Sequence, residues 1–332
     1  MKRNIIKKIF LCMLVCALLV GCGNSTSSTT KNEKETKETV NINYAGSFSN
    51  SVLCVMKHEK LMEKYLPEET TVNWTGSAAA SEIRDGIISG SIDIGAYAMP
   101  TYIMGTLNDL PLTMISALGN TPIKLYSNSD TINNISDFIS TDKISVVGLG
   151  STLQIAMLAE IKEEGLDGST FDNVWTVMSH ADGLAALSGG NDIQGLLLTF
   201  PTTLKADATE TIHEVYDLSD IALDYGIGTV NVCTNELYEN HPEIIEAFLS
   251  AQEDAIQMYK DDPETFAQIL ADDWEIDVQI VLDTLEVMPP EMEIVGYNKQ
   301  TDLLYELGLL EKEAVPFEEL GNYEKLLELS GK

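Results

Sequence analysis

Positive charge is scarce in this 332-residue chain, which has 20 lysine and arginine residues against 52 aspartate and glutamate residues. Four of the positive residues lie within residues 1–22, so the rest of the chain has 16 positive against 52 negative residues, a formal −36. Such a surface repels nucleic acids and anionic lipid head groups. Neither is therefore expected as a partner.

Cysteine and histidine are also rare, with five cysteines and four scattered histidines. After residue 22 only Cys54 and Cys233 remain, and they form either one disulfide or two buried thiols; the sequence leaves both open. The chain has no CxxC pair and no histidine cluster. No metal site and no cofactor are therefore expected.

The apolar run at residues 9–20 is shorter than the roughly 20 residues that a membrane-spanning helix needs. It follows a basic start and is typical of a secretory signal. The run ends in Leu-Val-Gly-Cys, which resembles a bacterial lipoprotein signal. We expect a signal peptide at 1–21, lipid on Cys22, a disordered tether at 22–39 and an anchor to the outer face of the cell membrane.

Strand and helix patterns alternate through residues 40–234, which favours an α/β fold with mostly parallel strands. From residue 235 the pattern is wholly helical, with a long helix opening at His241-Pro242. Helices are expected at 51–65, 77–89, 151–164 and 181–188. Strands are expected at 40–45, 71–75, 92–97, 112–118, 123–126, 143–147, 173–178, 193–199, 212–216 and 228–234.

One unit occurs twice, at residues 85–100 and 182–201. Each copy reads as a helix, a glycine stop, an aspartate, a buried strand and a proline where the strand ends. Coincidence is a rival explanation, because glycine, aspartate and proline are common at the ends of helices and strands in α/β proteins. Two copies about a hundred residues apart nevertheless predict two similarly built lobes.

Small hydroxyl residues mark three predicted helix starts, and ligands of open α/β sheets bind where such helices begin. The free N–H groups there suit an anion or a polar acceptor. A single serine at such a place is usually only an N-cap. Three starts from two lobes predict a cleft, with aromatic residues and one histidine near the same strand ends. The predicted ligand-binding residues are Ser47, Phe48, Ser49, Trp74, Gly76, Ser77, Tyr97, Gly150, Ser151, Thr152, His180 and Phe200.

Arginine is nearly absent, and Arg84 is the only one after the signal. It lies about two turns into its predicted helix, roughly 10 Å from the helix start. A bidentate arginine clamp on a ligand carboxylate is therefore not expected. Two ligand types stay open: an oxyanion held by N–H and hydroxyl groups, or a neutral ring stacked on aromatic side chains.

Four segments together resemble the substrate-binding proteins of ABC importers, in the nitrate, sulfonate, taurine and thiamine-precursor group. They are Ala78–Tyr97, Lys143–Thr152, Gly189–Pro201 and Asn235–Phe248. The resemblance implies a two-lobed periplasmic-binding-protein type 2 fold, with two sheets joined by a two-strand hinge and a helical C-terminal tail. Lobe 1 would take 40–124 and 225–332, and lobe 2 would take 125–224. Ser49, Ser77, Tyr97, Ser151 and Thr152 would line the cleft.

The implied function is a lipid-anchored, monomeric solute-binding protein that delivers a small molecule to an ABC permease. A sulfonate, nitrate or taurine-type anion is one ligand expectation, and a thiamine pyrimidine precursor or flavin is the alternative. An enzyme is not expected, because the cysteine run of the thiamine-pyrimidine synthases is missing. His180 with Ser151 is the one catalytic pair to consider, and no Gly-x-Ser-x-Gly surrounds that serine. A surface sensor or adhesion module, using the acidic tail, is a further alternative.

Overall fold

The computed structural model describes residues 37–76, 80–108, 110–190 and 193–329. The predicted signal peptide, the lipidation site Cys22 and the cleft residue Ser77 lie outside the described residues. Residues 37–39, expected in the tether, already belong to the folded part: Thr39 begins a strand, and Lys37 Nζ lies 2.7 Å from Asp93 Oδ1. No helix in the described ranges combines the length and apolarity needed to cross a membrane.

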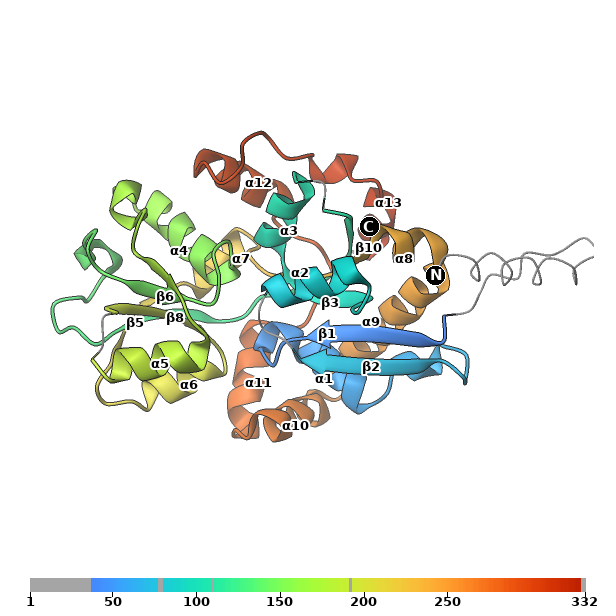
Figure 1. Cartoon of the computed structure of the whole chain (residues 1–332). Coiled ribbons are helices and arrows are strands. Elements are labelled where there is room, and N and C mark those ends of the chain that lie inside the picture. Colours follow the sequence, from blue (N-terminus) through green and yellow to red (C-terminus); the bar gives the residue numbers. More distant parts are fainter. Residues whose placement is uncertain (1–36, 77–79, 109, 191–192, 330–332) are drawn as a thin grey trace, which may run out of the picture. The chain divides into compact units, whose positions relative to one another are not determined.

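Two mixed five-stranded sheets form the fold (Figure 1), and two mixed sheets are what the family resemblance implied. The first has the order β2 (Thr71–Gly76), β1 (Thr39–Tyr44), β3 (Ile94–Ala98), β10 (Thr229–Thr234) and β4 (Leu112–Gly119). The second has the order β7 (Trp175–Val177), β6 (Ile144–Val146), β8 (Gly195–Thr199), β5 (Ile123–Ser127) and β9 (His213–Asp217). We call the parts built around these sheets lobe 1 and lobe 2.

One strand in each sheet runs against its neighbours. β10 is antiparallel to β3 and β4, and β5 is antiparallel to β8 and β9, whereas the other pairs are parallel. These two are the strands that follow the crossings between the lobes, at residues 120–122 and 225–228. The lobe bounds stay a prediction. β5 begins at Ile123 and pairs only with strands of the second sheet. This pairing favours placing the first boundary between the lobes before Ile123 rather than at residue 124.

The sequence repeat occupies equivalent places in the two sheets. α2 (Ala80–Ser89) leads into β3, and α5 (His180–Ser188) leads into β8, and both strands are third in the order of their sheet. Gly90 and Gly190 take the left-handed conformation after these helices, with φ of 75° and 67°. The two lobes are thus similarly built, as the repeat predicted.

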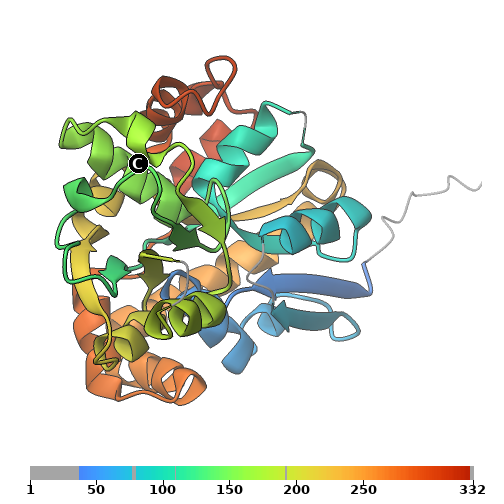
Figure 2. The same cartoon turned by 60° about the vertical axis from the view of Figure 1, so that its left-hand side comes forward.

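The helices cover the sheets and form the C-terminal tail (Figures 1 and 2). α1 (Ser51–His58) is shorter than expected, because Lys60 turns into the left-handed region and the Leu61 N–H donates to the Met56 carbonyl. Long α9 (Pro242–Asp261) buries Ile245, Phe248 and other apolar residues of one face. The other helices are α3 (Met99–Thr106), α4 (Thr152–Glu163), α6 (Thr202–Asp207), α7 (Ser219–Asp224), α8 (Asn235–Asn240), α10 (Pro263–Trp274), α11 (Val278–Val287), α12 (Tyr297–Glu306) and α13 (Tyr323–Glu328).

Cys54 and Cys233 are buried free thiols, so the disulfide alternative does not apply. Burial raises the pKa of both thiols to about 12. They therefore stay protonated and unreactive at neutral pH.

The C-terminal tail is fixed to the second crossing by a close backbone approach. Gly226 and Gly296 lie against one another with positive φ values of 62° and 72°, and the Gln300 side chain donates to the Gly226 carbonyl at 2.7 Å. A Cβ on Gly296 would lie 2.2 Å from the Tyr225 carbonyl oxygen. From there α12 packs beside α3 of lobe 1, and Glu306 pairs with Lys162 of lobe 2 at 2.8 Å.

We expect Gly296→Ala to destabilise the protein by about 3 kcal/mol or more, because it adds a backbone clash to the left-handed strain of about 1 kcal/mol. Gly308→Ala is the matched control: its φ is 69°, and a Cβ there would meet nothing within 4 Å. Urea unfolding measures both free energies. Equal losses of unfolding free energy in the two variants would show that the close backbone contact between Gly226 and Gly296 does not hold the tail in place.

Candidate functional site

A cavity of about 810 Å³ is lined by residues of both lobes. Most of its lining comes from the carboxyl ends of five strands and the segments that follow them: β1, β3, β6, β7 and β8. Those are the ends at which α/β sheets bind ligands. Residues of α2 and of the two crossings complete the lining. The volume is within the range of small-molecule sites, about 300–1,000 Å³.

Lobe 1 contributes a set of mutually bonded polar side chains after β1. Asn50 Nδ2 donates to Ser47 Oγ at 3.0 Å, and Ser47 Oγ is 3.1 Å from Ser49 Oγ. Thr229, at the start of β10, donates from Oγ1 to Ser49 Oγ at 3.1 Å. Ser49 and Asn50 are both buried. This wall is therefore preorganised before any ligand enters.

Lobe 2 contributes two helix starts. Ser151 caps α4 by accepting from the Gln154 N–H at 3.5 Å, and Ser179 caps α5 by accepting from the Asp182 N–H at 3.1 Å. Both serines line the cavity, as does Thr152 in the first turn of α4. The Gly150 carbonyl accepts from Thr101 Oγ1 of α3 at 2.9 Å, which is a direct hydrogen bond between the lobes.

Tyr97 and Phe200 line the cavity, but two other predicted aromatic residues do not. Phe48 is 2% exposed and packs in the core against Phe200, with ring centroids 5.6 Å apart. Trp74 meets Tyr44 edge to face at 6.0 Å. Their neighbours thus give these two rings a packing role.

His180 and Thr121 line this cavity, and each also has one buried polar atom. His180 Nε2 and Thr121 Oγ1 are shielded from solvent and have no hydrogen-bond partner. Burial lowers the pKa of His180 from 6.5 to about 4, so its imidazole is neutral at physiological pH. Thr121 lies in the first crossing, immediately before Pro122.

The described residues that line the cavity include two carboxylates, Glu82 and Asp182, and neither lysine nor arginine. Arg84 lies outside the lining and pairs with Asp85, Nη2 to Oδ1, at 2.9 Å. Two apolar lining residues of lobe 2, Leu149 and Val177, are 65% and 56% exposed. The surface of the cavity is therefore mostly apolar, and its described charged residues are acidic.

The structure brings seven of the predicted residues to this cavity: Ser47, Ser49, Tyr97, Ser151, Thr152, His180 and Phe200. Phe48, Trp74, Gly76 and Gly150 lie outside its lining, and Gly150 instead contacts α3. Contact with a ligand stays a prediction for all of them. Sequence reasoning missed several lining residues that lie at crossings, at caps or within α3: Asn50, Thr101, Thr121, Ser179 and Thr229.

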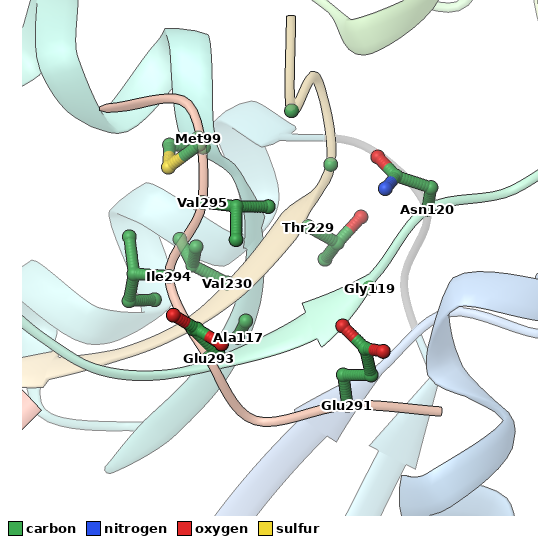
Figure 3. Close-up of a pocket in the computed structure, with 12 residues that line it drawn as sticks. Met99, Ala117, Gly119, Asn120, Thr229, Val230, Glu291, Glu293, Ile294 and Val295 are labelled. Carbon is green, nitrogen blue, oxygen red and sulfur yellow. The ribbon is translucent and has the colours of Figure 1, made fainter. Parts of the chain in front are cut away.

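A second cavity of about 30 Å³ lies at the crossings, where the segment of Glu291, Glu293 and Val295 passes β4 and β10 (Figure 3). Its volume suits about one water molecule. No group of three or more histidine, cysteine or acidic side chains in the described ranges is arranged to hold a metal ion.

The sequence profile of the NMT1/THI5-like family matches residues 73–266, more than half of the chain. The chain belongs to this family. No curated protein sequence matches it.

Solved structures share the fold at low identity. The alkanesulfonate-binding protein SsuA of Xanthomonas axonopodis pv. citri, bound to MOPS, is 17% identical with a TM-score of 0.70, and the match covers 84% of this chain and 96% of that one. A ligand-binding component of an ABC-type import system from Staphylococcus aureus, with zinc bound, is 15% identical with a TM-score of 0.73, over 89% and 100% of the two chains. The nitrate-binding protein NrtA of Synechocystis PCC 6803 is 13% identical with a TM-score of 0.66, over 89% and 86%.

His180 makes stability depend on pH in a predictable direction. The unfolded chain protonates this group near its ordinary pKa of 6.5, whereas the folded chain does so only near pH 4. The free energy of unfolding therefore falls as the pH drops from 6.5 to 4, by up to about 3 kcal/mol from this residue, and is unaffected above 6.5.

We expect His180→Gln to lack the part of the fall in unfolding free energy between pH 6.5 and 4 that His180 causes. Urea unfolding at a series of pH values measures this. Exposed His58 provides the control, and the acid loss due to His180 is expected to persist in His58→Gln. Parallel pH curves for wild type and His180→Gln would contradict the assignment.

Proposed function

We propose that this protein is the solute-binding component of an ABC importer and captures a small molecule in the cavity between its lobes. The observation that carries the proposal is the cavity itself, which five strand ends from two sheets surround. Family membership and the fold shared with import-system proteins support it. A fold alone does not determine function. The binding function is therefore argued from the cavity.

The proposal includes an extracytoplasmic, monomeric protein with lipid on Cys22. A short tether would keep it beside its permease at an effective concentration on the order of 1 mM. Ligand contacts to both lobes would favour the closed arrangement, which the permease would recognise. The bond from Thr101 to the Gly150 carbonyl already joins the lobes in this structure.

The cavity supports an uncharged ligand better than an anion. Neither lysine nor arginine is found among its described lining residues, while Glu82 and Asp182 are. A carboxylate near a bound anion costs electrostatic free energy. A neutral heteroaromatic ring avoids that cost and has Tyr97 and Phe200 as packing partners. A thiamine pyrimidine precursor or a flavin fits this description.

An anion is the second candidate, favoured by the starts of α4 and α5 at the cavity. Each helix start stabilises a negative charge by about 0.3–1 kcal/mol. The sulfonate- and nitrate-binding relatives show that the fold accepts anions, at identities too low to transfer the ligand.

Catalysis is not proposed. His180 Nε2 has no hydrogen-bond partner, so this atom does not pair with Ser151, whose hydroxyl caps α4. A nucleophile needs an adjacent base within hydrogen-bond reach. Binding without turnover is the activity that the cavity supports.

A thermal-shift panel tests the proposal with nitrate, taurine, ethanesulfonate, the pyrimidine precursor of thiamine and riboflavin. A neutral ring compound at 100 times its Kd adds about 2.7 kcal/mol, which raises Tm by about 5 °C or more. Thr152→Trp, which adds a bulky ring to the cavity lining at the first turn of α4, should reduce that shift.

If no compound raises Tm, while a purified membrane-surface protein binds tightly, a sensor or adhesion function replaces the importer function. A shift that persists at full size in Thr152→Trp would place the ligand elsewhere on the protein.

A further inference from the structure

The accessible apolar surface of the large cavity belongs mainly to lobe 2. Tyr97, Leu153 and Phe200 line the cavity, but they are only 3%, 3% and 4% exposed. Leu149 and Val177 also line it and are 65% and 56% exposed. Since the cavity surface is mostly apolar, these two residues supply apolar area that a solute can reach and that the buried rings do not.

Leu149 and Val177 lie at neighbouring strand ends, on the same side of their sheet. Val177 ends β7 and is paired with Val146, which ends β6, and paired residues of adjacent strands point to the same face. Val146 packs in the apolar cluster that holds the buried residues of α4, so this is the α4 face. Leu149 lies in the segment that joins β6 to α4. We call Leu149 and Val177 the apolar pair.

Lobe 1 already contacts lobe 2 beside the apolar pair and leaves the pair open. Gly150, the neighbour of Leu149, is buried, and its carbonyl accepts from Thr101 Oγ1 of α3 at 2.9 Å. A Cβ on Gly150 would lie 2.3 Å from Met104 Cε, so α3 sits directly against this backbone. Leu149 is still 65% exposed. The contact between the lobes therefore does not cover the apolar pair, and a solute in the cavity can.

Resting on the proposed function, we propose that Leu149 and Val177 are specificity-determining residues that pack against an apolar side of the solute. Removing apolar surface from water is favourable in rough proportion to its area, so a solute with a ring or alkyl face gains affinity there. A small, wholly polar solute such as nitrate gains nothing from the apolar pair. The substrate class is therefore a molecule with one extended apolar side.

Calorimetric titration of the full chain tests this with two ring probes, riboflavin and 4-amino-5-hydroxymethyl-2-methylpyrimidine. Val177→Thr keeps the side-chain shape and replaces a methyl by a hydroxyl, and it should weaken binding of each probe that binds about threefold. Leu149→Asn removes more apolar surface and should weaken it about tenfold. Titrations at several temperatures should give a negative heat-capacity change in wild type that is smaller in both variants.

The same substitutions at exposed apolar residues outside the cavity lining are the matched controls. Val287 of α11 is 70% exposed and Leu309, after α12, is 41% exposed. Val287→Thr and Leu309→Asn should leave both the affinity and the heat-capacity change of binding as in wild type. Val177→Thr and Leu149→Asn should also keep the Tm of the protein without probe within about 2 °C, because exposed side chains contribute little to stability.

The outcomes separate this inference from the proposed function. Equal probe affinity in wild type, Val177→Thr and Leu149→Asn would overturn the inference and leave the proposed function standing. Binding of nitrate, taurine or ethanesulfonate but of neither ring probe would do the same, because those solutes have little or no apolar side. Failure of both ring probes and of the whole thermal-shift panel would refute the proposed function, and this inference with it.

Discussion

The site depends on one constraint: β5 and β10 each run antiparallel to both of their neighbours in their own sheet. Each strand follows a crossing between the lobes and enters the receiving sheet against the direction of its neighbours. The remaining strands of each sheet run parallel to one another, so their carboxyl ends share one edge. Five of these strand ends surround a single cavity, and the hydroxyl-bearing helix starts come with them.

Much of this arrangement was predictable because it is encoded locally. The strands alternate with helices whose glycine stops and caps are visible in the sequence, and the repeat at 85–100 and 182–201 marked the equivalent units α2–β3 and α5–β8. Serine at a helix start is a local signal too. Ser49 and Ser151 reach the cavity because parallel strands end where helices begin.

The rest depends on contacts between distant segments. Phe48 follows a strand end as a ligand-contacting residue would, but its ring meets Phe200 and Trp274, from residues far along the chain. Thr121 has no motif around it, and its place in the cavity lining comes from the crossing. The approach of Gly226 to Gly296 is likewise invisible to periodicity, because it joins a lobe crossing to the tail.

We propose an uncharged solute, because the cavity has a neutral imidazole, hydroxyls that already bond one another and two carboxylates. The central claim is that solute binds between the lobes. A crystal structure of the protein grown with a compound that raises its Tm tests this most directly. The account predicts ligand density bounded by Ser49, Tyr97 and His180. Density only on the outer surface, with the cavity holding solvent, would contradict it.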